Sequence, residues 1–91
     1  MSTVITLGLN VTTNSTEDTQ RIVRPLLNQF TIQVIGTGTF SAAIQGSFDG
    51  TNWYALATKT ADEIFTVPVV PYLRLVTSGM SGADVTVYAG V

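Results

Sequence analysis

The chain has 91 residues, of which 45% are hydrophobic and only 11% are charged, and its formal net charge is −2. It contains no cysteine and no histidine, which excludes disulfide bonds, thiolate or imidazole metal sites and the commonest general base. An average domain carries about 25% charged residues. The few basic residues argue against nucleic acid as a partner. The length predicts one domain that spans residues 1–91.

The N-terminus shows no basic segment followed by an apolar one, so we expect no signal peptide and synthesis in the cytoplasm. The apolar runs are far shorter than the roughly 20 residues of a membrane helix. We therefore expect no membrane partner.

Residues 1–29 are expected to hold an N-terminal strand and a polar loop. Four apolar residues alternate with polar or small ones and predict a strand with one apolar face: Ile5, Leu7, Leu9 and Val11. Residues 12–19 are rich in threonine, asparagine and serine, which predicts an exposed loop. Residues 20–23 are a short strand candidate that Pro25 ends, because proline is excluded from the middle of a sheet.

Residues 30–91 are expected to form a core of hairpins. Six apolar residues alternate on either side of Gly36-Thr37-Gly38: Phe30, Ile32, Val34, Phe40, Ala42 and Ile44. Glycines permit the positive φ of a tight turn, so this segment predicts a hairpin in which Val34 faces Phe40. Opposed residues of an antiparallel pair share a face, and all six are therefore expected in the core.

Asp49-Gly50 is a strong hairpin signal and predicts a second turn. A two-residue or four-residue loop places Trp53 inward, on the face of Gly46 and Phe48. A three-residue loop instead sends Tyr54 and Leu56 inward. We favour the inward Trp53, because a large ring covers the backbone of a glycine that has no side chain.

The remainder predicts a strand over 63–67, an extended connection over 68–71, where two prolines occur, and a last hairpin of 72–77 with 84–90. Four residues of this hairpin are expected to point inward: Leu73, Leu75, Val85 and Val87. Leu75 is expected to oppose Val85, and Leu73 to oppose Val87. About eight short strands, with turns roughly every 8–12 residues, predict an all-β antiparallel sandwich or jelly-roll-like fold.

No group of residues predicts catalysis. Asp62 and Glu63 are adjacent in a strand, so they point to opposite faces and cannot act jointly as acid and base. Asp49 is expected to form a turn rather than to bind a cation with Asn52. The serines and threonines have no histidine that would activate them. We expect a non-enzymatic protein without cofactor or metal.

Two groups of residues are candidates for binding. Tyr72, Arg74 and Tyr88 are expected on the outer face of the last hairpin, a composition that is favoured at protein contacts. The small size and low charge predict self-association as a dimer or trimer through this patch. Trp53 and Tyr54 are an alternative platform for a sugar ligand.

The stretch Gly46-Ser47-Phe48-Asp49-Gly50-Thr51-Asn52-Trp53, followed by Pro71-Tyr72-Leu73-Arg74-Leu75 and a terminal strand rich in threonine and valine, resembles small β-sandwich structural proteins of tailed bacteriophages. The resemblance covers residues 30–91. It implies a capsid decoration, or cement, protein that binds the major capsid protein on the virion surface. A tail, baseplate or head-fibre component and a carbohydrate-binding module remain the alternatives.

Overall fold

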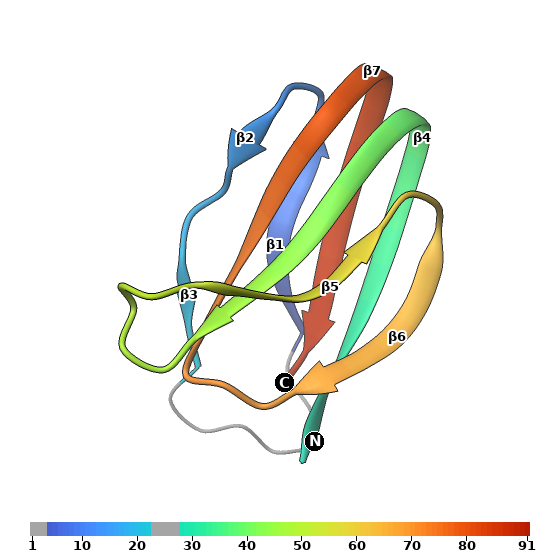
Figure 1. Cartoon of the computed structure of the whole chain (residues 1–91). Helices are drawn as coiled ribbons and strands as arrows, with labels where there is room; N and C mark the ends of the chain where they lie inside the picture. Colours follow the sequence, from blue (N-terminus) through green and yellow to red (C-terminus); the bar gives the residue numbers. More distant parts are fainter. Residues whose placement is uncertain (1–3, 23–27) are drawn as a thin grey trace.

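The computed structural model describes residues 4–22 and 28–91, and all regular structure in them is β (Figure 1). The strands form one antiparallel seven-stranded sheet. They are β1 (Val4–Val11), β2 (Ser15–Thr16), β3 (Gln20–Arg21), β4 (Gln29–Ser47), β5 (Tyr54–Lys59), β6 (Glu63–Pro68) and β7 (Tyr72–Gly90). The all-β class is confirmed. No helix in the described part of the chain could cross a membrane.

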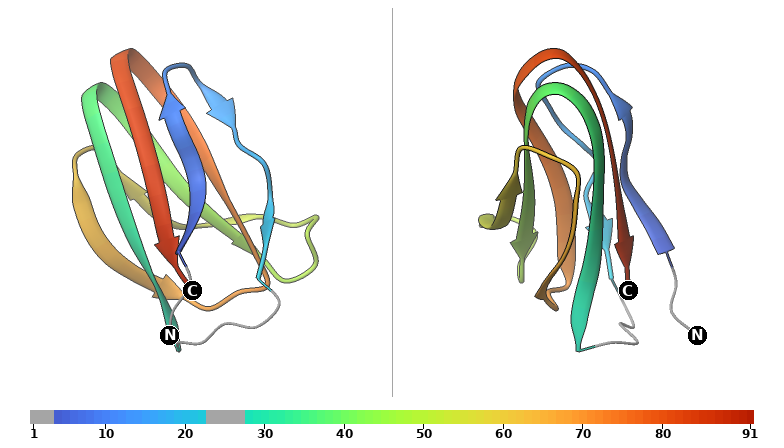
Figure 2. Two further views of the ribbon diagram at one scale, coloured as in Figure 1. Left: turned by 180° about the vertical axis from the view of Figure 1, so that it is seen from behind. Right: turned by 90° about the vertical axis from the view of Figure 1, so that its right-hand side faces the viewer.

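Two long strands, β4 and β7, form the frame of the molecule. Each has 19 residues, and they pair from Thr31 with Gly90 to Ser47 with Tyr72. Both strands bend over halfway, where the register shifts between Thr37 and Ser41 of β4. The side view in Figure 2 shows the two arms of each bent strand facing each other. The strands thus form one continuous sheet that is doubled over into two layers. The predicted sandwich of two separate sheets, or jelly roll, is not established by this arrangement.

Each layer contains one arm of each long strand. The first layer holds β1, the C-terminal arm of β7, the N-terminal arm of β4 and β6. The second layer holds β2 and β3, the N-terminal arm of β7, the C-terminal arm of β4 and β5. The core lies between the layers, because the inner faces of both arms of a bent strand turn toward each other.

The inward-facing residues were assigned correctly in both long strands. All ten residues that were expected inward are buried and belong to the core: Phe30, Ile32, Val34, Phe40, Ala42, Ile44, Leu73, Leu75, Val85 and Val87. Alternation with period two determines which face a side chain occupies, and this holds along each arm.

The predicted partners of these residues were wrong. Val34 pairs with Val87 rather than with Phe40, and Ile44 pairs with Leu75. Leu75 accordingly does not oppose Val85. Each glycine-rich segment lies at the bend of one long strand, and the two bent strands pair with each other along both arms. Neither segment is the turn of a hairpin whose two arms pair with each other. Either arrangement places the same side chains inward, so the alternation could not distinguish them.

Strand β1 departs from the single apolar face that its sequence predicts. Leu7 and Val11 are buried, but Leu9 is 61% exposed. The register with β7 shifts on both sides of Gly8, and Asn10 has a φ of 51°. Such bulges insert unpaired residues and rotate the following side chains, so Leu9 leaves the core face.

The polar segment 12–19 is largely exposed, as predicted, but it is also tied to the sheet. Its residues Ser15–Thr16 form β2, which pairs with β7. The buried hydroxyl of Thr77 accepts a hydrogen bond from the backbone N–H of Ser15 at 3.0 Å and donates one to the carbonyl of Thr13 at 2.9 Å. The segment is therefore held against β7 by a side chain of the sheet.

Three further expectations concern short segments. The strand predicted over 20–23 is present as β3, whereas Val23 and Pro25 lie outside the described residues. The strand over 63–67 is confirmed as β6. Val69 and Val70 belong to no strand, as predicted, whereas Pro68, which was expected in the same connection, is the last residue of β6.

Candidate functional site

The loop that connects β4 to β5 is organised by the carboxylate of Asp49. Its Oδ1 accepts hydrogen bonds from the backbone N–H groups of Thr51 and Asn52, both at 2.8 Å, and from the hydroxyl of Ser47 at 2.9 Å. Its Oδ2 accepts one from Nδ2 of Asn52 at 2.7 Å. The predicted turn-forming role of Asp49 is confirmed.

These hydrogen bonds also stabilise the ionised form of Asp49. The backbone N–H of Asn52 and then that of Thr51 hold the pKa of Asp49 well below its usual range, because both stabilise the ionised carboxylate. Gly50 completes the turn with a φ of 75°, and its N–H donates to the Ser47 hydroxyl at 2.9 Å. The loop is thus held in one conformation by a side chain that is ionised at neutral pH.

The end of the loop is fixed by a stacked pair. The guanidinium carbon of Arg74 lies 4.1 Å from the centre of the Trp53 ring, and Nε of Arg74 donates to Oε1 of Gln45 at 2.7 Å. Arg74 lies between the inward residues Leu73 and Leu75, so it occupies the outer face and Trp53 does too.

The inward placement of Trp53 was therefore wrong. Gly46 pairs with Tyr54, which makes the connection longer than any of the turns that we considered. Leu56 and Val70, rather than Trp53, cover Gly46, since a Cβ on this glycine would lie 2.8 Å from atoms of both. Trp53 is half-buried against Arg74 and does not belong to the core.

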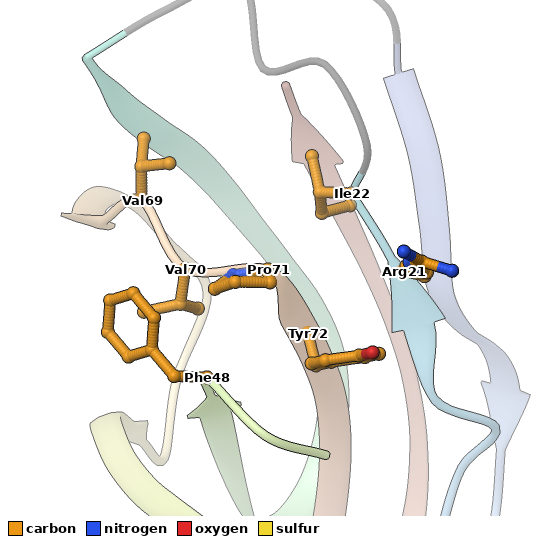
Figure 3. A pocket seen from close by; sticks show the side chains of 7 residues that line it. All are labelled: Arg21, Ile22, Phe48, Val69, Val70, Pro71 and Tyr72. Atoms are coloured by element: carbon orange, nitrogen blue, oxygen red, sulfur yellow. The ribbon is translucent and has the colours of Figure 1, made fainter.

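Phe48, at the start of this loop, is 77% exposed. It forms the wall between two depressions of the surface, which we call the Phe48 site. The first has a volume of about 460 Å³ and separates Phe48 and Val70 from Ile22 of the β3 segment (Figure 3). Figure 3 shows the Phe48 ring beside Val70, which Pro71 follows in the chain.

The second depression lies on the other side of Phe48 and has a volume of about 290 Å³. Tyr54, which is 70% exposed, lines it opposite the loop, and Gly46, Leu56 and Val70 also line it. The glycine leaves room for these apolar side chains. The Phe48 site is thus a mainly apolar surface with two exposed aromatic rings, and Arg21, Asp49 and Asn52 also line it.

The residues predicted as an interface do not come together. Tyr72 and Arg74 lie in the second layer, where they pair with Ser47 and Gln45. Tyr88 lies in the first layer and pairs with Gln33 and Thr6. The outer faces of the two layers point in opposite directions, so the three side chains cannot form a single patch.

Trp53 and Tyr54 likewise do not form one platform. The face of Trp53 is occupied by Arg74 on the outer side of the sheet, whereas Tyr54 lines the second depression. Neighbouring residues of an extended chain point to opposite sides. Tyr54 instead shares its site with Phe48. The sequence predicted an inward Phe48, and only the position of Phe48 next to the Asp49 turn indicated that it could be exposed.

The acidic residues of the β5–β6 turn have separate structural roles. Asp62 accepts a hydrogen bond from the backbone N–H of Gly36 at 2.7 Å, and Glu63 forms an ion pair with Lys59 at 2.9 Å. Among residues 4–22 and 28–91, no cluster of three or more carboxylate, thiol or imidazole side chains is placed to hold a metal ion.

Comparison of the chain with protein-family models, with curated proteins and with solved structures found no match.

Replacing Trp53 by alanine should lower the free energy of unfolding by about 1–2 kcal/mol, rather than the 3–5 kcal/mol of a buried large aromatic residue, because the ring is half-buried and loses a cation–π contact. Urea unfolding measures this difference. The matched control is Tyr54→Ala, which removes the exposed neighbouring ring and should cost less than about 0.5 kcal/mol. A loss above about 3 kcal/mol for Trp53→Ala would contradict its placement on the outer face.

Proposed function

We propose that the protein is a non-enzymatic structural protein of a tailed bacteriophage virion, a capsid decoration protein that docks onto the major capsid protein through the Phe48 site. The observation that carries this proposal is the 77% exposure of Phe48 on a loop held by Asp49 and by the Trp53–Arg74 stack. A large apolar ring in water costs free energy unless a partner covers it.

The rigidity of the loop supports docking onto a protein. A flexible loop loses conformational entropy when it binds, and a loop that is ordered beforehand avoids this cost. Aromatic anchors at a contact are the residues that most often dominate its binding energy. Phe48 and Tyr54 supply two such anchors, and the low charge of the surface suits a partner that is also weakly charged. The sequence stretch that resembles phage structural proteins includes this same loop.

The experiment is co-sedimentation with capsids that lack the protein. Phe48→Ser should weaken capsid binding by roughly tenfold to a hundredfold, because burying a phenylalanine side chain contributes about 1.5–3 kcal/mol. Leu9→Ser is the matched control, since Leu9 is 61% exposed on β1 and lies outside the Phe48 site. It should bind as the unchanged protein does.

Two outcomes would contradict the proposal. If the unchanged protein does not co-sediment with capsids, the decoration function is wrong. If both variants bind equally well, the Phe48 site is not the docking surface. Saturable binding of a sugar that Tyr54→Ala abolishes, without any capsid binding, would instead support a carbohydrate-binding module.

A further inference from the structure

The outer face of the first layer carries few charged side chains. Its middle row runs across four strands through Thr6, Tyr88, Gln33 and Ile64, as the pairing register requires. The rows on either side contribute Val4 and Ile35 together with threonine and glycine residues. Three acidic residues lie near the end of this face that is closest to the bends: Asp84 pairs with Thr37 of β4, and Asp62 and Glu63 line a depression together with Gln33, Ile35 and Ile64. Glu63 is paired with Lys59. We call this surface the β1–β6 face.

Three of its side chains are apolar and exposed: Ile64 is 65% exposed, Val4 67% and Ile35 43%. Between Val4, Tyr88 and Ile64 lies a shallow depression of about 230 Å³. Antiparallel sheets that face water normally carry polar side chains outward. Here the core side of the same strands is filled by Phe30, Ile32 and their neighbours, so Ile64, Val4 and Ile35 lie outside that core.

We infer that the β1–β6 face packs against the same face of a second copy of this chain, forming a two-fold dimer. In a two-fold contact, residues meet their own counterparts, and like charges near the axis would repel. The middle row of this face, Thr6, Tyr88, Gln33 and Ile64, carries none. Val4 and Ile64 protrude beside the depression, so the two-fold operation can place a protruding side chain of one copy in the depression of the other.

The area also suits a dimer. The molecule measures 36 × 28 × 17 Å along its principal axes, and the shortest dimension is that of two stacked sheet layers. The cross-section of the molecule parallel to its layers is therefore large enough for a contact of roughly 800 Å² per subunit, the area of a standard stable interface. Two sheets that pack face to face in this way bury their apolar side chains between them, as in a domain core.

Sedimentation velocity of the full chain tests the inference. The unchanged protein should be a dimer at roughly 10 μM, and Ile64→Lys should raise the dissociation constant at least about tenfold, because each dimer then carries two added charges at the contact. Thr58→Lys is the matched control: Thr58 is exposed on the edge strand β5 of the other layer, and its dimer should persist. Gln33→Lys provides a second variant of the face if Ile64→Lys does not fold.

A monomer at roughly 100 μM would overturn the inference, and so would equal dimer stability in Ile64→Lys and Thr58→Lys. This test is independent of capsid docking, because the Phe48 site and the β1–β6 face share no residue. Phe48→Ser should therefore remain a dimer while it loses capsid binding. A dimer that Phe48→Ser disrupts and Ile64→Lys leaves intact would contradict the assignment of the face.

Discussion

Replacing Phe30 by alanine should lower the free energy of unfolding by about 3–5 kcal/mol. Phe30 is fully buried near the start of β4. Its backbone pairs with Val67 of β6 in the first layer, and its side chain lies between the two layers. The change removes the apolar area of a whole ring and leaves a cavity, since the surrounding strands are hydrogen-bonded and collapse only in part. A domain of this size has a total stability of only about 5–15 kcal/mol, so chemical denaturation should show a much earlier midpoint.

Phe48→Ala is the matched control, because it is the same chemical change at a residue that is 77% exposed. Its cost should be about 1 kcal/mol or less. Should Phe30→Ala not fold, Phe30→Leu retains most of the volume and allows the comparison to be made. Equal losses in Phe30→Ala and Phe48→Ala would contradict the assignment of one ring to the core and the other to the surface.

Replacing Gly38 by alanine should be comparably destabilising, by about 3 kcal/mol or more, for a different reason. Gly38 lies where β4 bends and has a φ of 77°. A Cβ there would overlap the backbone carbonyl of Gly82, where β7 bends beside it. Because the obstacle is backbone and not a flexible side chain, the two bends would have to separate, and the doubled-over sheet depends on their close approach.

Gly79→Ala separates the clash from the backbone strain. Gly79 has a φ of 58°, close to that of Gly38, but a Cβ on it would meet no atom within 4 Å. This variant should therefore lose only the strain of a positive φ, about 1–2 kcal/mol. Thermal or urea unfolding of both variants measures the difference. Equal losses would show that the bends are not in contact.

The alternation of apolar and polar residues along the chain determined the face that most side chains occupy. Phe30 and Ile44 face the core although the hairpin that was expected to pair their strands does not exist. The turn at Asp49 was also predictable, because an aspartate before a glycine bonds to backbone N–H groups that lie only two and three residues further along the chain. Both properties depend on local geometry.

The candidate site was predictable only in part. The loop 48–53 was recognised as a turn, but the orientation of its aromatic residues was reversed. Trp53 lies outward because Arg74 of β7 stacks on its ring while donating a hydrogen bond to Gln45 of β4. Leu56 and Val70 cover Gly46 in its place. Phe48, which was expected on the same inward face as Trp53, is exposed in the same loop.

What the sequence by itself determined was the all-β class, the inward residues of the long strands and the Asp49 turn. The tertiary structure alone decided which strands pair, and so it separated Tyr72 and Arg74 from Tyr88 and brought Phe48 to Tyr54. Period-two alternation specifies a face but not a partner, because a strand that bends and a strand that reverses place the same side chains inward. The choice between them depends on contacts between β4 and β7, whose residues lie far apart in the sequence.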